Sequence, residues 1–122
     1  MDKKIRCPGL PPISSRAGRP IGKFSAAGTV GPKLGFYTSA LLADGRVLMS
    51  GGYDTTAAKT AGYLATCELY DPATGKVSPT GSMATGRLAH SATTLLDGRV
   101  LVAGGVGGGD PANLTSAELY QP

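Results

Sequence analysis

One segment occurs twice in this chain, and this repeat constrains the fold more than any other feature. Residues 22–52 and 75–105 match at a spacing of 53 positions, from Gly-Lys at the start to Asp-Gly-Arg-Val-Leu and a Gly pair at the end. The phrase Glu68-Leu69-Tyr70 then returns 50 positions later. A period of this length indicates stacked or radially arranged repeat units rather than one irregular core.

The second copy predicts three short strands and a tight turn. The expected strands are His90–Leu96, Arg99–Ala103 and Ser116–Tyr120. Asp97-Gly98 predicts a two-residue hairpin turn between the first two, because both residue types tolerate a positive φ. The nearly unbroken apolar run in the second strand predicts burial on both of its faces.

The first copy supplies the end of the pattern. We expect a third strand at Thr66–Tyr70, a turn through Asp71-Pro72-Ala73-Thr74-Gly75, and a fourth strand at Lys76–Ser78. Lys23–Ser25 matches this fourth strand one period earlier. Residues 57–66 are Ala-rich but contain Gly62 and no helix start signal, so we interpret them as loop. The chain is therefore expected to be all-β.

The order of these phrases carries a family resemblance. His-Ser-Ala, then Asp-Gly-Arg-Val-Leu with a Gly pair, then Glu-Leu-Tyr-Asp-Pro and Thr-Gly-Lys-Val resembles the kelch repeat over residues 22–122. The resemblance implies that each unit is one four-stranded antiparallel blade of a β-propeller. Three positions depart from it. The family's usual Trp in the fourth strand is Phe24 in one copy and Val77 in the other, and Arg87 and His90 are replaced by Leu34 and Tyr37 in the first copy.

The strands add up to two kelch blades in a permuted order. Residues 22–74 hold the fourth strand of the closing blade and three strands of the full blade, and residues 75–122 hold the remaining strands. Two blades make an incomplete ring, since propellers have typically four to eight. Two explanations stay open. The chain is a fragment that lacks neighbouring blades, or it is a homo-oligomer in which each Phe24 strand completes a neighbour's blade, with a dimer giving four blades and a trimer six.

The charge is concentrated at the N-terminus. Residues 1–23 contain six Lys and Arg against one acid, and the rest of the chain is nearly neutral. We interpret residues 1–21 as a disordered, solvated basic tail, and without aromatic interleaving we expect no nucleic-acid partner. No apolar run is long enough for a membrane span, and no signal peptide is recognisable, so we expect no membrane contact and leave the compartment open.

The predicted meander sorts the connections between two faces. The tight turns lie on one face, and the long connections at 53–65, 79–89 and 106–115 lie on the other. Binding residues concentrate on loops held by a rigid scaffold, so we place any ligand or partner on the long-loop face. The candidate contacts are Tyr53, Asp54, Lys59, Tyr63, Arg87, Asp110 and Asn113.

Catalysis is a weaker interpretation of these residues. Galactose oxidase is a kelch-type enzyme, and the resemblance would imply a copper site with two His, two Tyr and a Cys–Tyr crosslink. This chain has one histidine, His90, which we interpret as a structural hydrogen-bonding group. Ser91 is adjacent to it in a strand and therefore points to the opposite face. Cys67 aligns with Ala117 and is expected to be a small core residue, and two cysteines make neither a disulfide framework nor a zinc site.

The sequence therefore favours a non-catalytic module that binds a protein or carbohydrate. We expect no catalytic residue, metal ligand or cofactor. The alternative is a fragment of a galactose oxidase-type propeller that is inactive alone, and a third possibility is a truncated reading frame without a function of its own. The glycine-rich stretch 104–110 lacks the Gly-Lys-Ser/Thr ending of a phosphate-binding loop and is interpreted as a flexible loop.

Overall fold

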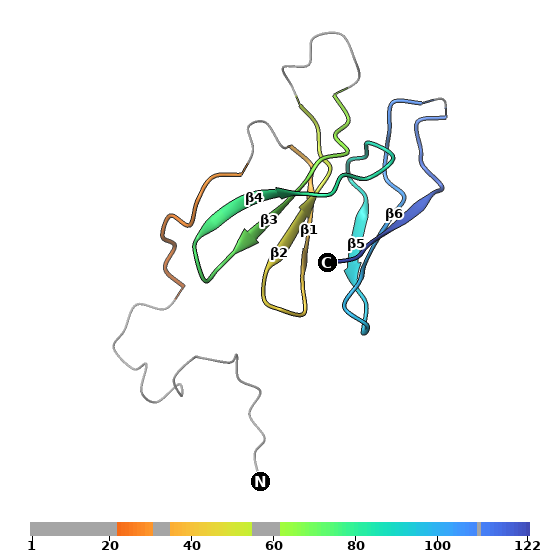
Figure 1. Cartoon of the computed structure of the whole chain (residues 1–122). Coiled ribbons are helices and arrows are strands. Elements are labelled where there is room, and N and C mark those ends of the chain that lie inside the picture. The colour runs from red at the N-terminus through yellow and green to blue at the C-terminus, as the bar shows by residue number, and fades with distance from the viewer. Residues whose placement is uncertain (1–21, 31–34, 55–61, 110) are drawn as a thin grey trace.

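The described part of the chain folds into two antiparallel sheets (Figure 1). The computed structural model describes residues 22–30, 35–54, 62–109 and 111–122. The first sheet contains β1 (Thr38–Leu41), β2 (Val47–Ser50), β3 (Cys67–Asp71) and β4 (Lys76–Thr80) in chain order. The second contains β5 (Ser91–Thr94), β6 (Val100–Ala103) and β7 (Ala117–Tyr120). The described residues form no helix, and so none that could cross a membrane, and the all-β prediction is confirmed.

The strand register repeats from one sheet to the other. Val47 lies opposite Tyr70 and Leu48 opposite Leu69 in the first sheet, and the equivalent pairs in the second are Val100 with Tyr120 and Leu101 with Leu119. The connections repeat as well: the bridges Gly35↔Tyr53 and Tyr53↔Tyr63 recur as Leu88↔Val106 and Val106↔Asn113. The sequence repeat is therefore a repeat of structure, including the loops.

The β1–β2 and β5–β6 turns differ from the prediction. The Leu42 N–H donates to the Arg46 carbonyl over 2.8 Å and the Gly45 N–H to the Leu42 carbonyl over 3.0 Å, which closes a three-residue loop. Only Gly45 has a positive φ, of 92°. The two-residue turn was wrong because the Asp44 carboxylate accepts a hydrogen bond from the Arg46 N–H and keeps Asp44 out of the left-handed region. The second turn, at 96–98, repeats this arrangement.

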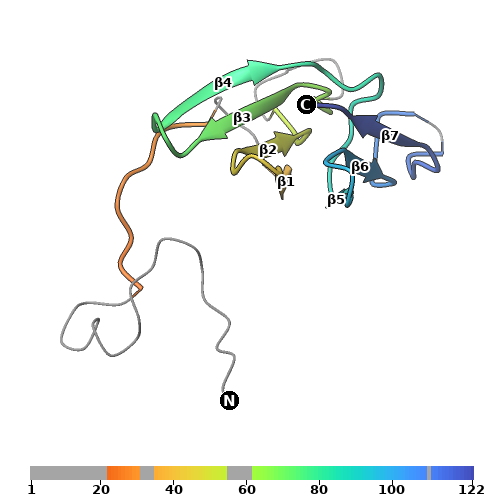
Figure 2. The same cartoon turned by 60° about the horizontal axis from the view of Figure 1, so that its bottom comes forward.

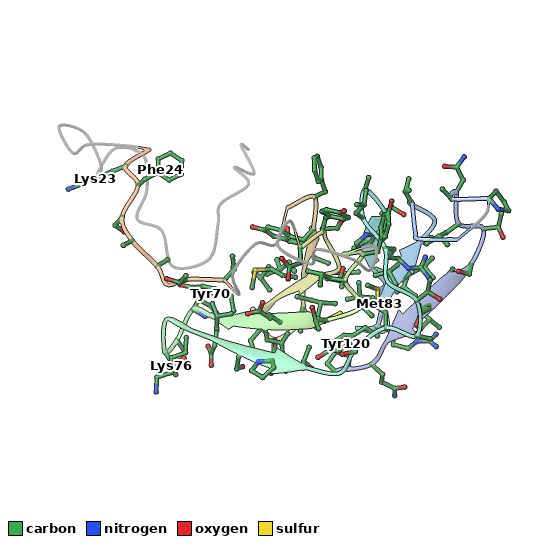
Figure 3. The ribbon with its side chains drawn as sticks, turned by 90° about the horizontal axis from the view of Figure 1, so that it is seen from above. Lys23, Phe24, Tyr70, Lys76, Met83 and Tyr120 are labelled. Carbon is green, nitrogen blue, oxygen red and sulfur yellow. The ribbon has the colours of Figure 1, made fainter. Side chains whose placement is uncertain are left out.

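The hydrophobic core lies between the two sheets. One face of the first sheet buries Leu48 and Leu69 against Val100 and Val102 of the second sheet. Leu101, which points the other way from β6, is only half-buried. Burial of this strand on both faces was therefore wrong, since no described strand covers its second face. In Figure 3, Met83 and Tyr120 lie where the two sheets meet, and both pack against the core.

The Gly pairs after β2 and β6 mark a close approach of two backbones. Gly51 and Gly105 have φ values of 68° and 87°, and a Cβ on either would collide with the carbonyl oxygen of Arg87 or Leu88. The Gly52 N–H donates to the same Arg87 carbonyl over 2.9 Å. These glycines therefore let the β4–β5 connection run directly against both sheets.

Residues 22–30 form no strand within this chain. Phe24 is 98% exposed, and Figures 1 and 2 place the segment on the side of the first sheet away from the second sheet. The fourth strand predicted at Lys23–Ser25 is thus not paired here, and its role in a neighbouring blade stays a prediction. The tail at 1–21 lies outside the described residues.

Candidate functional site

The connections sort between two faces as the meander predicts. The β1–β2, β3–β4 and β5–β6 turns lie at the lower side of Figure 1, and the long connections lie at the upper side. We call the upper side the long-loop face; its described residues are 35–37, 51–54, 62–66, 81–90, 104–109 and 111–116.

Four aromatic residues lie in the described connections at the long-loop end of the first sheet, and one of them, Tyr37, also lines a groove on the outward face of that sheet. The Tyr53 and Tyr63 rings meet edge to face with centroids 5.4 Å apart. Tyr53 also pairs with Gly35 through two backbone hydrogen bonds. This pairing places the segment before β1, which contains Phe36 and Tyr37, next to the connection that follows β2. We call Phe36, Tyr37, Tyr53 and Tyr63 the aromatic cluster.

Phe36 is the most unusual member of the cluster. Its side chain is 72% exposed and its φ is 58°, a left-handed conformation that bulky residues rarely adopt. The equivalent residue, Ala89, has a φ of 52° and donates its N–H to the Phe36 carbonyl over 3.2 Å. Sequence reasoning missed Phe36 as a contact residue. The available signal was a Phe aligned with an Ala, but the conformation that holds it outward is visible only in the structure.

The structure brings together only some of the predicted contacts. Tyr53, Asp54 and Tyr63 lie within or beside the aromatic cluster. Asn113 is exposed at the equivalent place on the second sheet, where its partner is Val106 rather than an aromatic residue. Lys59 and Asp110 lie outside the described residues.

Arg87 is a correction to the predicted site, because its side chain is fully buried. Its Nη1 donates to the carbonyls of Gly104 and Ser116, each over 3.0 Å. Its Nη2 donates to the Ser116 hydroxyl over 3.1 Å and to the Glu118 carboxylate over 3.0 Å. The guanidinium therefore fastens the β4–β5 connection to the second sheet and is not available to a surface partner.

Glu118 completes this anchor from β7. Its carboxylate also accepts the N–H groups of Ala84 over 2.7 Å and Thr85 over 3.2 Å. Burial by itself would raise the pKa of Glu118, but the two amide donors and the Arg87 guanidinium together lower it. Glu118 is thus held as a carboxylate by the connection that precedes its own sheet.

His90 and Ser50 form a buried pair between the sheets. The imidazole Nε2 lies 2.9 Å from the Ser50 hydroxyl, whose residue is 1% exposed, and Nδ1 has no partner. Burial, and secondarily the positive charge of Arg87, lower the pKa of His90. Without access to Ser50 or an acid on Nδ1, the pair does not serve as a nucleophile and base. The Thr38 hydroxyl also donates to the His90 carbonyl over 2.9 Å, so the predicted structural role agrees with these contacts.

Cys67 is a core residue, as predicted. It is 4% exposed, and burial raises the pKa of its thiol. Within the described part of the chain, no group of three or more His, Cys, Asp and Glu side chains is placed to hold a metal ion.

Neither a protein-family model nor a curated protein sequence matches the chain. Among the described residues of the long-loop face, the aromatic cluster contains the exposed large apolar side chains, Phe36 and Tyr37.

Proposed function

We propose that the two sheets are consecutive kelch-type propeller blades and that the chain is a non-catalytic binding module for a protein or glycan partner. The blade assignment is supported by the repeated meander and by the placement of β1 beside β5, as in a radial arrangement of sheets. The partner binds the long-loop face of the first sheet, centred on the aromatic cluster.

A comparison of the two repeats carries this proposal. At the positions of Phe36, Tyr37, Tyr53 and Tyr63, the second repeat has Ala89, His90, Val106 and Asn113. The second repeat makes the same backbone bridges through Val106 and Asn113. The fold therefore does not require aromatic side chains at these positions. The left-handed backbone is shared with Ala89, but the exposed Phe36 ring leaves apolar surface in water that a bound partner can cover.

The chemistry of the cluster suits a contact surface. Phe36 offers a wide apolar surface, and the tyrosines combine an apolar ring with a hydroxyl that hydrogen-bonds at a wet interface. Aromatic residues of this kind dominate the energetics of protein interfaces, and their flat rings also stack on the apolar faces of sugar rings.

The proposal is tested by selecting peptides from a displayed library and oligosaccharides from a glycan array with the immobilised full chain. Phe36→Ser and Tyr53→Ser are expected to weaken the selected ligand at least about tenfold, since aromatic hot spots contribute about 2 kcal/mol or more. Leu96→Ser is the matched control, because Leu96 is fully exposed but lies on the tight-turn face. Circular dichroism checks that each variant is folded.

Ligands that bind both aromatic variants as well as the wild type would overturn the choice of face. Equal loss in Leu96→Ser would show that the selected binding is nonspecific adhesion to apolar side chains. A protein ligand and a glycan are separated by which of the two libraries yields the binder.

A further inference from the structure

The outward faces of the two sheets correspond, position by position in the repeat, to the two faces that pack together at the junction. In the second sheet, Leu101 and Leu119 point away from the core and Leu119 is 50% exposed, whereas their equivalents Leu48 and Leu69 are 1% and 7% exposed against the neighbouring sheet. The second sheet thus presents the kind of surface that the first sheet already buries.

The first sheet shows the converse. Val47 and Tyr70 line a shallow groove of about 350 Å³ on its outward face, while their equivalents Val100 and Tyr120 lie in the packed junction between the sheets. Ala27, Gly28 and Val30 lie along this groove. One period later, Gly81 and Met83 occupy the same place against the second sheet. The outward face of the first sheet is therefore lined by the same repeat positions as the face of the second sheet that packs against the first.

The second sheet also has an edge without a described partner. β4 pairs with β3 in the first sheet, but no described strand pairs with the outer edge of β7. The segment that repeats β4 is residues 23–27, which is exposed and extends away from its own second sheet (Figure 2). Gly22 has a φ of 73° and its equivalent Gly75 has 69°, so the segment starts from the same local conformation as β4.

We infer that the occupant of these surfaces is a second copy of this chain, bound head to tail. Residues 23–27 of one copy pair with β7 of the other, and the outward face of one first sheet packs on the outward face of the other copy's second sheet. The contact repeats the sheet-to-sheet junction that each chain already contains. Such an interface is heterologous, so two or three copies close into four or six sheets. This inference does not rest on the proposed binding function, although Tyr37 of the aromatic cluster also lines the groove.

The repeat fixes the register of the added strand. β4 pairs Leu69 with Ser78 and Glu68 with Pro79. Pro79 has no N–H, so its nitrogen points away from β3, and Ser78 is the neighbour that turns its N–H and carbonyl toward β3. By equivalence, Ser25 lies opposite Leu119 and exchanges hydrogen bonds with β7, whereas Ala26 occupies the place of Pro79.

This alternation gives a matched pair of proline variants. Ser25→Pro removes an N–H that the ladder needs, and Ala26→Pro reproduces what β4 already tolerates. Both residues are exposed in the single chain, so neither change affects the fold of the sheets. Light scattering of the purified full chain should give a mass two or three times 12.3 kDa. Ala26→Pro should keep that mass, and Ser25→Pro should reduce it to that of one chain.

A second pair of variants tests the sheet faces. Leu119→Asp should also give single chains, while Leu96→Asp, which changes a fully exposed leucine in the β5–β6 turn, should assemble normally. In the assembled wild type, hydrogen exchange should protect the amides of residues 23, 25 and 27 and leave those of 24 and 26 unprotected. A folded wild type with the mass of one chain would overturn the inference, as would Ser25→Pro that assembles like the wild type.

Discussion

At the scale of single residues, Arg87 is a buried charged side chain that needs several hydrogen-bond partners. Its guanidinium is fully buried and makes four hydrogen bonds to three residues that follow it in the chain. We expect Arg87→Ala to lower the free energy of unfolding by on the order of 3 kcal/mol, because it removes four hydrogen bonds, one of them to the Glu118 carboxylate, from a fully buried position. Urea unfolding followed by circular dichroism measures the change.

The matched control for Arg87 is Arg99, which pairs with Asp97 in the β5–β6 turn. That ion pair has an N–O distance of 2.7 Å, but both side chains are largely solvated. Since exposed ion pairs contribute little to stability, Arg99→Ala should unfold close to the wild type. Equal destabilisation in the two variants would contradict a special role for the Arg87 anchor.

His90 makes the stability of the fold depend on pH. Burial lowers its pKa in the folded chain, while the unfolded chain keeps the ordinary value of 6.5. As pH falls through 6.5 the unfolded state takes up a proton that the folded state does not. The free energy of unfolding therefore keeps its full value above this pH and declines below it. The slope approaches about 1.4 kcal/mol per pH unit until the folded pKa is reached.

Urea unfolding at a series of pH values checks this dependence. His90 is the only histidine, so His90→Asn should remove the decline that begins below pH 6.5. The lowered pKa of Glu118 removes stability only at lower pH, below its ordinary value of 4.5. An unchanged slope in His90→Asn would assign the titration to another group.

At the scale of elements, the Asp-Gly turns set where each hairpin reverses. Gly98 has a φ of 91°, and an added Cβ would meet nothing closer than 4.0 Å, so only the backbone conformation opposes a side chain. Gly98→Ala should therefore lower the unfolding free energy by about 1–2 kcal/mol. Gly81→Ala is the control, because Gly81 has an ordinary φ and open space around its Cβ. Thermal unfolding compares the two, and equal losses would contradict the argument.

Elements also show where sequence reasoning succeeds. The positions of the seven observed strands and the four-residue turn after Asp71 follow from alternation and turn residues, which are local properties. The length of the β1–β2 turn did not follow, because an Asp side chain bonding two residues ahead competes with the two-residue turn that its sequence also permits.

At the scale of the whole molecule, the two sheets relate to each other as one repeat to the next. At their junction, the face of the first sheet that carries Leu48 packs on the face of the second sheet that carries Val100. These are opposite faces of the repeat unit, so each sheet keeps its other face outward. This polarity is why the outward faces match each other, and why the proposed contact between copies needs no new kind of packing. The proposed assembly would use the sheet faces and the proposed binding the long-loop face, and Tyr37 lies at the border of the two because it also lines the groove of the first sheet.

The all-β class, the repeat period and the separation of tight turns from long connections could be predicted from the amino acids alone, because they follow from local chemistry repeated along the chain. Which residues of the long connections face solvent depends on the tertiary structure. Arg87 lies on a predicted long connection and Phe36 on the equivalent segment one repeat earlier, yet Arg87 is fully buried and Phe36 is 72% exposed. Their burial depends on Gly104, Ser116 and Glu118 arriving from the second sheet and on the left-handed backbone at Phe36, and neither can be seen from residues adjacent in sequence.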